Sequence, residues 1–131
     1  YNADSGRNLN GRGDSMRPEP QFFFFPGATP TLEFVLPVEI DVSTDILYVS
    51  FSQGYETVKE YDQDSSAVTA DGNSIYVAMS QADTLKFGAG DCEVQLRYLL
   101  ADGTADVSVP VPGLVGRTQM TEVLQKEVTG T

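Results

Sequence analysis

The sequence lacks histidine and tryptophan, has a single cysteine, Cys92, and contains no long apolar run. Without histidine and with one thiol, the chain cannot assemble a Ser-His-Asp or Cys-His relay, a Cys/His zinc site or an internal disulfide. A membrane-spanning helix needs roughly 18 apolar residues, so neither such a helix nor an apolar secretory leader is expected. These absences remove most common catalytic machinery, and we expect a protein that is not an enzyme and carries no cofactor or metal.

Basic side chains are also scarce. Eight Lys and Arg stand against nineteen Asp and Glu in 131 residues, a formal net charge of −11 at pH 7. A field of this sign repels phosphate backbones and anionic lipid, so we expect neither nucleic acid nor a membrane as a partner. The length suits one folded unit, and the 40% hydrophobic content is ordinary for a globular domain.

The chain divides into three parts by composition. Residues 1–26 are expected to form an extended N-terminal arm, because residues 1–15 are rich in Asn, Gly, Ser and Asp and hold too few apolar side chains to order themselves. This first stretch is either native or precedes an original start at Met16. A β-sandwich domain is expected over residues 27–117. Residues 118–131 form a C-terminal tail that could become a short helix against a partner.

Four consecutive phenylalanines, Phe22, Phe23, Phe24 and Phe25, stand at the end of the arm, bracketed by prolines. Successive side chains of an extended segment point to opposite sides, so the four rings cannot all face one core. Two interpretations follow. Either the segment is a first strand packed on its own domain with some exposure, or the arm docks on a neighbouring subunit. All four are therefore candidate partner-binding residues.

Alternation of apolar and polar residues predicts short strands over most of the body. They are expected at residues 31–40, 47–52, 57–61, 74–79, 92–100 and 105–111, with a short partner strand around residue 68. Asp71-Gly72 tolerates positive φ and predicts a tight hairpin, while Ser80 followed by Asp83 predicts one helical turn. The pattern favours an all-β fold, a single immunoglobulin-like antiparallel β-sandwich of six or seven strands, with a small closed barrel as the alternative.

Prolines and the cysteine add local expectations. Pro37 lacks an N–H, which places the strand at residues 31–40 at an edge or divides it. Pro110 and Pro112 are expected to stop continuous pairing and to mark another sheet edge. Cys92 falls on the inward register of its strand, so we expect it to be buried, and its isolation fits assembly in a reducing cytoplasm.

Two short motifs are candidate binding sites. Arg12, Gly13 and Asp14 present a cation and a carboxylate on a flexible loop, a geometry that integrin-type receptors recognise. The same tripeptide arises easily by chance in an arm of this composition, so an inert arm is the alternative. Asp62 and Asp64 are similar to the opening of a calcium loop, but the glycine and glutamate that such a loop requires further on are absent.

A resemblance to a known family rests on four runs of the body. They are GATPTLEFVLP from Gly27, LYVSFSQG from Leu47, DGNSIYVAMSQADTLKF from Asp71 and EVQLR from Glu93. Over roughly residues 27–117, the chain resembles small structural proteins of tailed phages and prophages of Gram-positive and gut bacteria. The resemblance implies a virion component of immunoglobulin-like or baseplate-domain type, assembled in the host bacterial cytoplasm and without catalytic residues. The 26 residues before Gly27 depart from the family pattern.

The expected function is that of a virion structural protein, a capsid decoration or cement protein or a tail-associated subunit, attached through its N-terminal arm. Its expected partners are capsid or tail subunits and further copies of the chain. The alternative is a host-surface adhesion or carbohydrate-binding module, which would use Arg12, Gly13 and Asp14 or surface tyrosines to hold a receptor.

Overall fold

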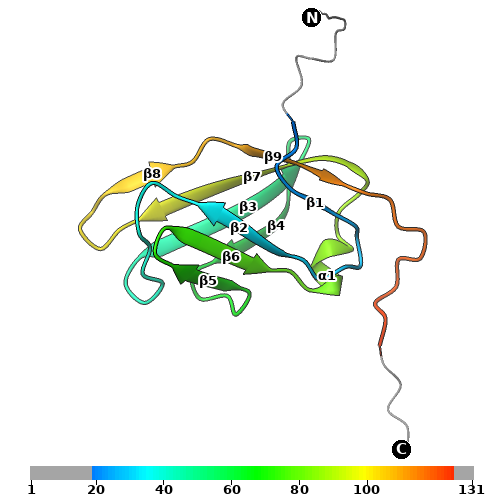
Figure 1. Ribbon diagram of the computed structural model, residues 1–131, viewed down its shortest axis with the longest axis horizontal. Helices are drawn as coiled ribbons and strands as arrows, with labels where there is room; N and C mark the ends of the chain where they lie inside the picture. The colour runs from blue at the N-terminus through cyan, green and yellow to red at the C-terminus, as the bar shows by residue number, and fades with distance from the viewer. Residues whose placement is uncertain (1–18, 126–131) are drawn as a thin grey trace, which may run out of the picture.

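Nine strands and one short helix follow one another along residues 19–125, the part of the chain that the computed structural model describes. The strands are β1 (Phe23–Phe24), β2 (Thr31–Val35), β3 (Ile46–Gln53), β4 (Glu56–Asp62), β5 (Val68–Asp71), β6 (Ser74–Ala78), β7 (Gly90–Leu99), β8 (Ala105–Val107) and β9 (Val111–Val115). The helix α1 (Gln81–Thr84) precedes β7. Two facing sheets result, and the predicted immunoglobulin-like β-sandwich is confirmed (Figure 1).

The two sheets differ in size. The larger has the order β1-β9-β7-β3-β4, with β8 also paired to β7, and the smaller has the order β2-β6-β5. Every pair is antiparallel except β1 with β9, which run parallel, so the larger sheet is mixed rather than purely antiparallel as expected. The chain passes from β1 across to β2 in the other sheet. No hairpin therefore forces β1 to run against its neighbour.

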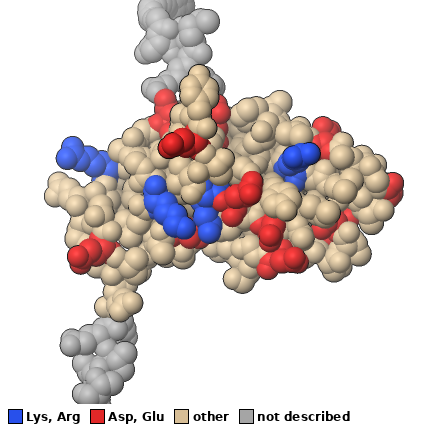
Figure 2. All heavy atoms as spheres, turned by 180° about the vertical axis from the view of Figure 1, so that it is seen from behind, with Lys and Arg blue, Asp and Glu red and all other residues tan. Residues whose placement is uncertain are grey.

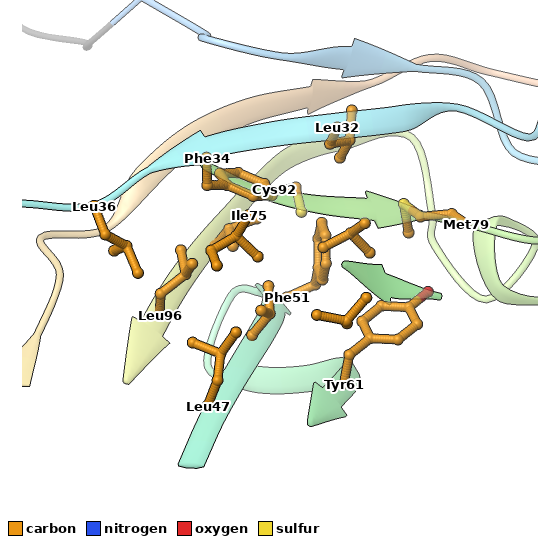
Figure 3. Close-up of a cluster of buried hydrophobic side chains, with 14 of the residues drawn as sticks. Leu32, Phe34, Leu36, Leu47, Phe51, Tyr61, Ile75, Met79, Cys92 and Leu96 are labelled. Carbon is orange, nitrogen blue, oxygen red and sulfur yellow. The ribbon is translucent and has the colours of Figure 1, made fainter. Parts of the chain in front are cut away.

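The core lies between the sheets, because the inward positions of both are apolar. Leu47 and Phe51 of β3 and Leu96 of β7 are almost completely buried, as is Ile75 of β6 in the smaller sheet. Figure 3 shows these side chains converging from opposite sheets on one cluster. Cys92 belongs to the same cluster, as its register predicts.

The predicted helical turn is confirmed and is fastened to the larger sheet. Ser80 is the N-cap of α1, and its Oγ accepts a hydrogen bond from Asp83 N at 3.1 Å. The Asp83 carboxylate accepts from the Tyr61 hydroxyl at 2.8 Å and pairs with Lys59 Nζ at 3.5 Å. The helix therefore closes one end of the sandwich against β4.

The prolines end strands, but not always at a sheet edge. β2 stops at Val35, before Pro37, and is an edge strand, as expected. Pro112 instead lies within β9, between β1 and β7, which corrects the expected edge. The Pro112 carbonyl accepts a hydrogen bond from Gln21 N at 2.8 Å, where the pairing with the β1 segment begins. The N–H that proline lacks is therefore missing only at the start of this pairing.

The expected C-terminal helix is absent from residues 118–125. Leu124 N donates to Gln81 Oε1 at 2.8 Å, and Gln81 Nε2 donates to Leu124 O at 3.1 Å, which holds this segment beside α1 without helical structure. Residues 126–131 lie outside the described part. No helix among residues 19–125 is long and apolar enough to cross a bilayer.

Candidate functional site

β1 holds the phenylalanine segment against the sandwich. Phe22 O accepts from Leu114 N at 3.0 Å, and Phe24 O accepts from Gly116 N at 2.9 Å. Residues 21–25 are thus the outermost strand region of the larger sheet, and the expected boundary between arm and body at residue 26 must move toward the N-terminus. The rings supply the apolar burial that the polar residues before them lack.

The inner side of this segment belongs to the core. Phe24 is only 3% exposed and meets Phe87 edge to face, with ring centroids 5.2 Å apart. Phe22 is half-buried and packs edge to face on Phe34 and Phe51, with centroids 6.2 Å apart in both cases. These two rings stabilise the protein that carries them.

The rings of Phe22 and Phe25 pack against two glycines, Gly113 in β9 and Gly116 directly after it. A Cβ placed on Gly113 would overlap the ring of Phe22, and one placed on Gly116 would lie 2.5 Å from the ring of Phe25. A side chain at either position would force the neighbouring ring to shift. Glycine is therefore required here by close approach rather than by backbone conformation.

The outer side of the segment faces solvent. Phe23 and Phe25 are 50% and 49% exposed, and their rings meet edge to face with centroids 4.9 Å apart. Leu114 lies opposite Phe23 on β9 and is partly exposed. Phe23, Phe25 and Leu114 together form an apolar surface at the edge of the larger sheet, hereafter the β1 surface.

The chain that leaves β1 is tied down on both sides. Thr84 Oγ1, completely buried, accepts from Gly27 N at 2.9 Å and donates to Ala28 O at 2.9 Å. Thr118 Oγ1 donates to Pro26 O at 2.7 Å. Hydrogen bonds to α1 and to the segment after β9 therefore fix the position of the chain next to the β1 surface.

The predicted partner-binding residues separate into three groups. Phe23 and Phe25 are available to a partner, whereas Phe22 and Phe24 face the core of their own chain. This outcome confirms that four adjacent rings cannot all face one core. Arg12, Gly13 and Asp14 lie outside the residues that the structure describes.

Leu114, Gly113 and Gly116 were not identified from the sequence as contacts of the phenylalanines. A signal was present, since glycine inside a strand pattern marks a close approach of other groups. The pattern does not say which segment approaches, and β1 is about 90 residues away along the chain.

Two titratable groups of the core, Cys92 and Tyr61, have raised pKa values. Burial, with a smaller contribution from the charge of Glu93, raises the pKa of the Cys92 thiol to about 12. Burial also raises the pKa of Tyr61, as does the hydrogen bond that its hydroxyl donates to Asp83. An unreactive, protonated thiol is what a purely structural cysteine requires.

Asp62 closes a turn, with its Oδ1 accepting from Asp64 N at 2.9 Å. Within residues 19–125, no group of three or more Cys, Asp and Glu side chains is placed to hold a metal ion.

No family model and no curated protein match the chain. Among solved structures it is similar to CopC from Methylosinus trichosporium OB3b, with 14% identity, a TM-score of 0.43 and coverage of 73% of this chain and 85% of that one. It is also similar to extracellular domains 3–5 of Drosophila OTK (11%, 0.35, 79% and 33%) and to the V domain of amphioxus IgVJ-C2 (13%, 0.30, 72% and 98%). At such identities these similarities concern the fold alone.

Proposed function

We propose that this chain is a structural subunit of a phage particle that decorates or cements a capsid or joins a tail assembly. It acts by contact with capsid or tail subunits and with further copies of itself, and not as an enzyme. Attachment runs through the β1 surface, where the N-terminal arm meets the sandwich.

Two features of the sequence support this proposal. The resemblance over residues 27–117 is to virion proteins of immunoglobulin-like type. The absence of histidine and of a second cysteine leaves a chain suited to binding and support rather than to covalent chemistry.

The single observation that carries the proposal is the half-exposed pair Phe23 and Phe25. Aromatic side chains are enriched at protein interfaces, and the two rings already pack edge to face against each other on the surface. Covering the exposed half of each ring contributes roughly 1 kcal/mol. A contact of that size is weak alone, so it suits a subunit repeated many times on one particle.

The test replaces the two outward rings and leaves the inward ones in place. Deleting residues 1–26 is unsuitable, because it would also remove Phe22 and Phe24 from the core. The double variant Phe23→Ser, Phe25→Ser is expected to keep the fold, because both rings are half-exposed. Tyr55→Ser is the matched control, since Tyr55 is a fully exposed aromatic between β3 and β4.

Particles purified from host cells that produce each full-length chain are analysed by quantitative mass spectrometry. The unchanged chain and Tyr55→Ser are expected in the particles at equal, stoichiometric amounts, and the double variant at less than about a tenth of that amount. Particles that lack the unchanged chain, or that take up the double variant normally, would contradict the proposal.

A further inference from the structure

The few basic side chains of the described residues are not used in the same way. Lys59 and Lys86 both pair with Asp83, at 3.5 and 3.8 Å. The Arg97 guanidinium forms no ion pair and no hydrogen bond with any group in residues 19–125, although acidic side chains are abundant there. A guanidinium left unpaired in so acidic a domain is available to an anion from outside.

Arg97 lies on the outer face of the larger sheet, where its direct neighbours are not acidic. Tyr48 of β3 and Val107 of β8 lie opposite it on either side, while Gln95 and Leu99 flank it along β7. Figure 2 views the molecule from behind relative to Figure 1 and shows a small number of basic side chains among acidic and uncharged surface.

A hollow surrounds this guanidinium. Tyr48, Ser50, Glu60, Gln95 and Arg97 line a concavity of about 350 Å³. A second hollow of about 260 Å³ shares Tyr48 and Arg97 and continues over apolar side chains, including Ile46 and Leu99. The surface thus changes from polar to apolar across the arginine.

The polar half has unused hydrogen-bonding capacity, mostly as acceptors. Glu60 Oε2 accepts from Ser50 Oγ at 2.7 Å, and Glu60 Oε1 has no partner among the described residues. Gln95 Nε2 donates to Ser108 O at 3.0 Å, which leaves its amide oxygen open. The Tyr48 hydroxyl has no hydrogen bond within the described part of the chain, and the residue is 41% exposed.

We propose that this hollow is a binding site for a carboxylate-bearing sugar, such as a uronic acid residue of a glycan. The planar fork of Arg97 matches a carboxylate with two parallel hydrogen bonds. Glu60 and Gln95 accept from sugar hydroxyls, and the Tyr48 ring covers an apolar sugar face. A polyphosphate is disfavoured, because the net charge of −11 repels it and the hollow offers one cation only.

The site is independent of the β1 surface. Asp91, in the same cross-strand row as Phe23 and Leu114, precedes Arg97 by six residues on β7, which is about 20 Å along the strand. A chain attached through the β1 surface would still present the Arg97 hollow. Failure of either proposal therefore leaves the other standing.

The test titrates the full-length protein with methyl glucuronoside and follows its amide signals by nuclear magnetic resonance. We expect saturable shifts at residues 48, 50, 95 and 97. Methyl glucoside, which lacks the carboxylate, and acetate, which lacks the sugar, should each bind at least about tenfold more weakly.

Substitutions distinguish the specific contribution of the Arg97 guanidinium to binding from a general effect of net charge. Arg97→Gln should weaken glucuronoside binding by at least about tenfold, whereas Arg117→Gln, which removes one positive charge elsewhere, should leave it unchanged. Arg97→Lys should fall between them, because it keeps the charge and loses the fork. The proposal is overturned if glucuronoside shifts no signal, if acetate binds equally well, or if Arg97→Gln binds like the unchanged protein.

Discussion

The two sides of β1 show how one residue type takes two roles within a single short segment. Phe22 and Phe24 pack inward, Phe22 on rings of both sheets and Phe24 on Phe87, whereas Phe23 and Phe25 meet each other and face solvent. Composition does not distinguish them, since all four are phenylalanine. The alternation of an extended chain does, because it places the inner pair in the core and the outer pair at the surface.

The largest effect is expected from truncating the inner side. Phe24→Ala should lower the free energy of unfolding by about 3 to 5 kcal/mol, because Phe24 is almost completely buried against Phe87. Phe25→Ala should cost less than about 1 kcal/mol. Denaturant unfolding followed by circular dichroism measures the free energy of unfolding of both variants. Equal losses would contradict the distinction between inner and outer rings.

A slightly smaller loss of stability is expected when a side chain occupies the space of the Phe22 ring at Gly113. Gly113→Ala places a methyl group where the Phe22 ring lies, and overpacking of this kind should cost about 3 kcal/mol of unfolding free energy. Gly116→Ala disturbs the outward rings instead, which can turn toward solvent. Calorimetry of the two variants should show the lower melting temperature for Gly113→Ala. The reverse order would mean that the outer pair supports the fold.

The hydrogen bonds of Thr84 to the chain that follows β1 give a third test. Thr84→Val keeps the shape of the side chain but leaves Gly27 N and Ala28 O without their buried partner, at a cost of about 1 to 2 kcal/mol. Amide hydrogen exchange should quicken at Gly27 and in β1 more than in β3. Uniform quickening across both sheets would show that Thr84 serves the whole fold rather than this turn.

The smallest effect concerns pH. The Cys92 thiol has a folded-state pKa near 12, above its unfolded value of about 8.5. Because the folded pKa is the higher one, its contribution is complete below about pH 8.5 and is lost as the pH rises toward 12. Cys92→Ala should therefore lose less stability than the unchanged protein between pH 8 and 11, as measured by urea unfolding. Part of the decline should remain, since the pKa of Tyr61 is raised as well.

Much of the sandwich follows from local patterns in the sequence. The strands around Leu47 and Cys92, the hairpin at Gly72 and the cap at Ser80 all lie where alternation, turn chemistry and capping predict them. In each case the determining residues lie within one element or one turn. Local rules are sufficient there.

The β1 surface was only half predictable, because it depends on pairing between the two ends of the domain. The alternation of the phenylalanines predicts that some rings are exposed, but it does not reveal that β9 is their neighbour. The same gap explains the error at Pro112, because the sequence does not show that β1 pairs with β9 on that side. The Arg97 hollow brings together β3, β4 and β7, and no spacing in the sequence shows that its groups converge.

The parallel pairing of β1 with β9 also determines how the domain would carry a mechanical load. Tension applied at residue 21 and at residue 116 would pull the two strands in opposite directions along their common axis. The hydrogen bonds of Phe22 and Phe24 would then be loaded together in shear, instead of opening one at a time as at a peeled hairpin. The pairing of β1 with β9 would therefore resist separation of the strands when the two ends of the domain are pulled.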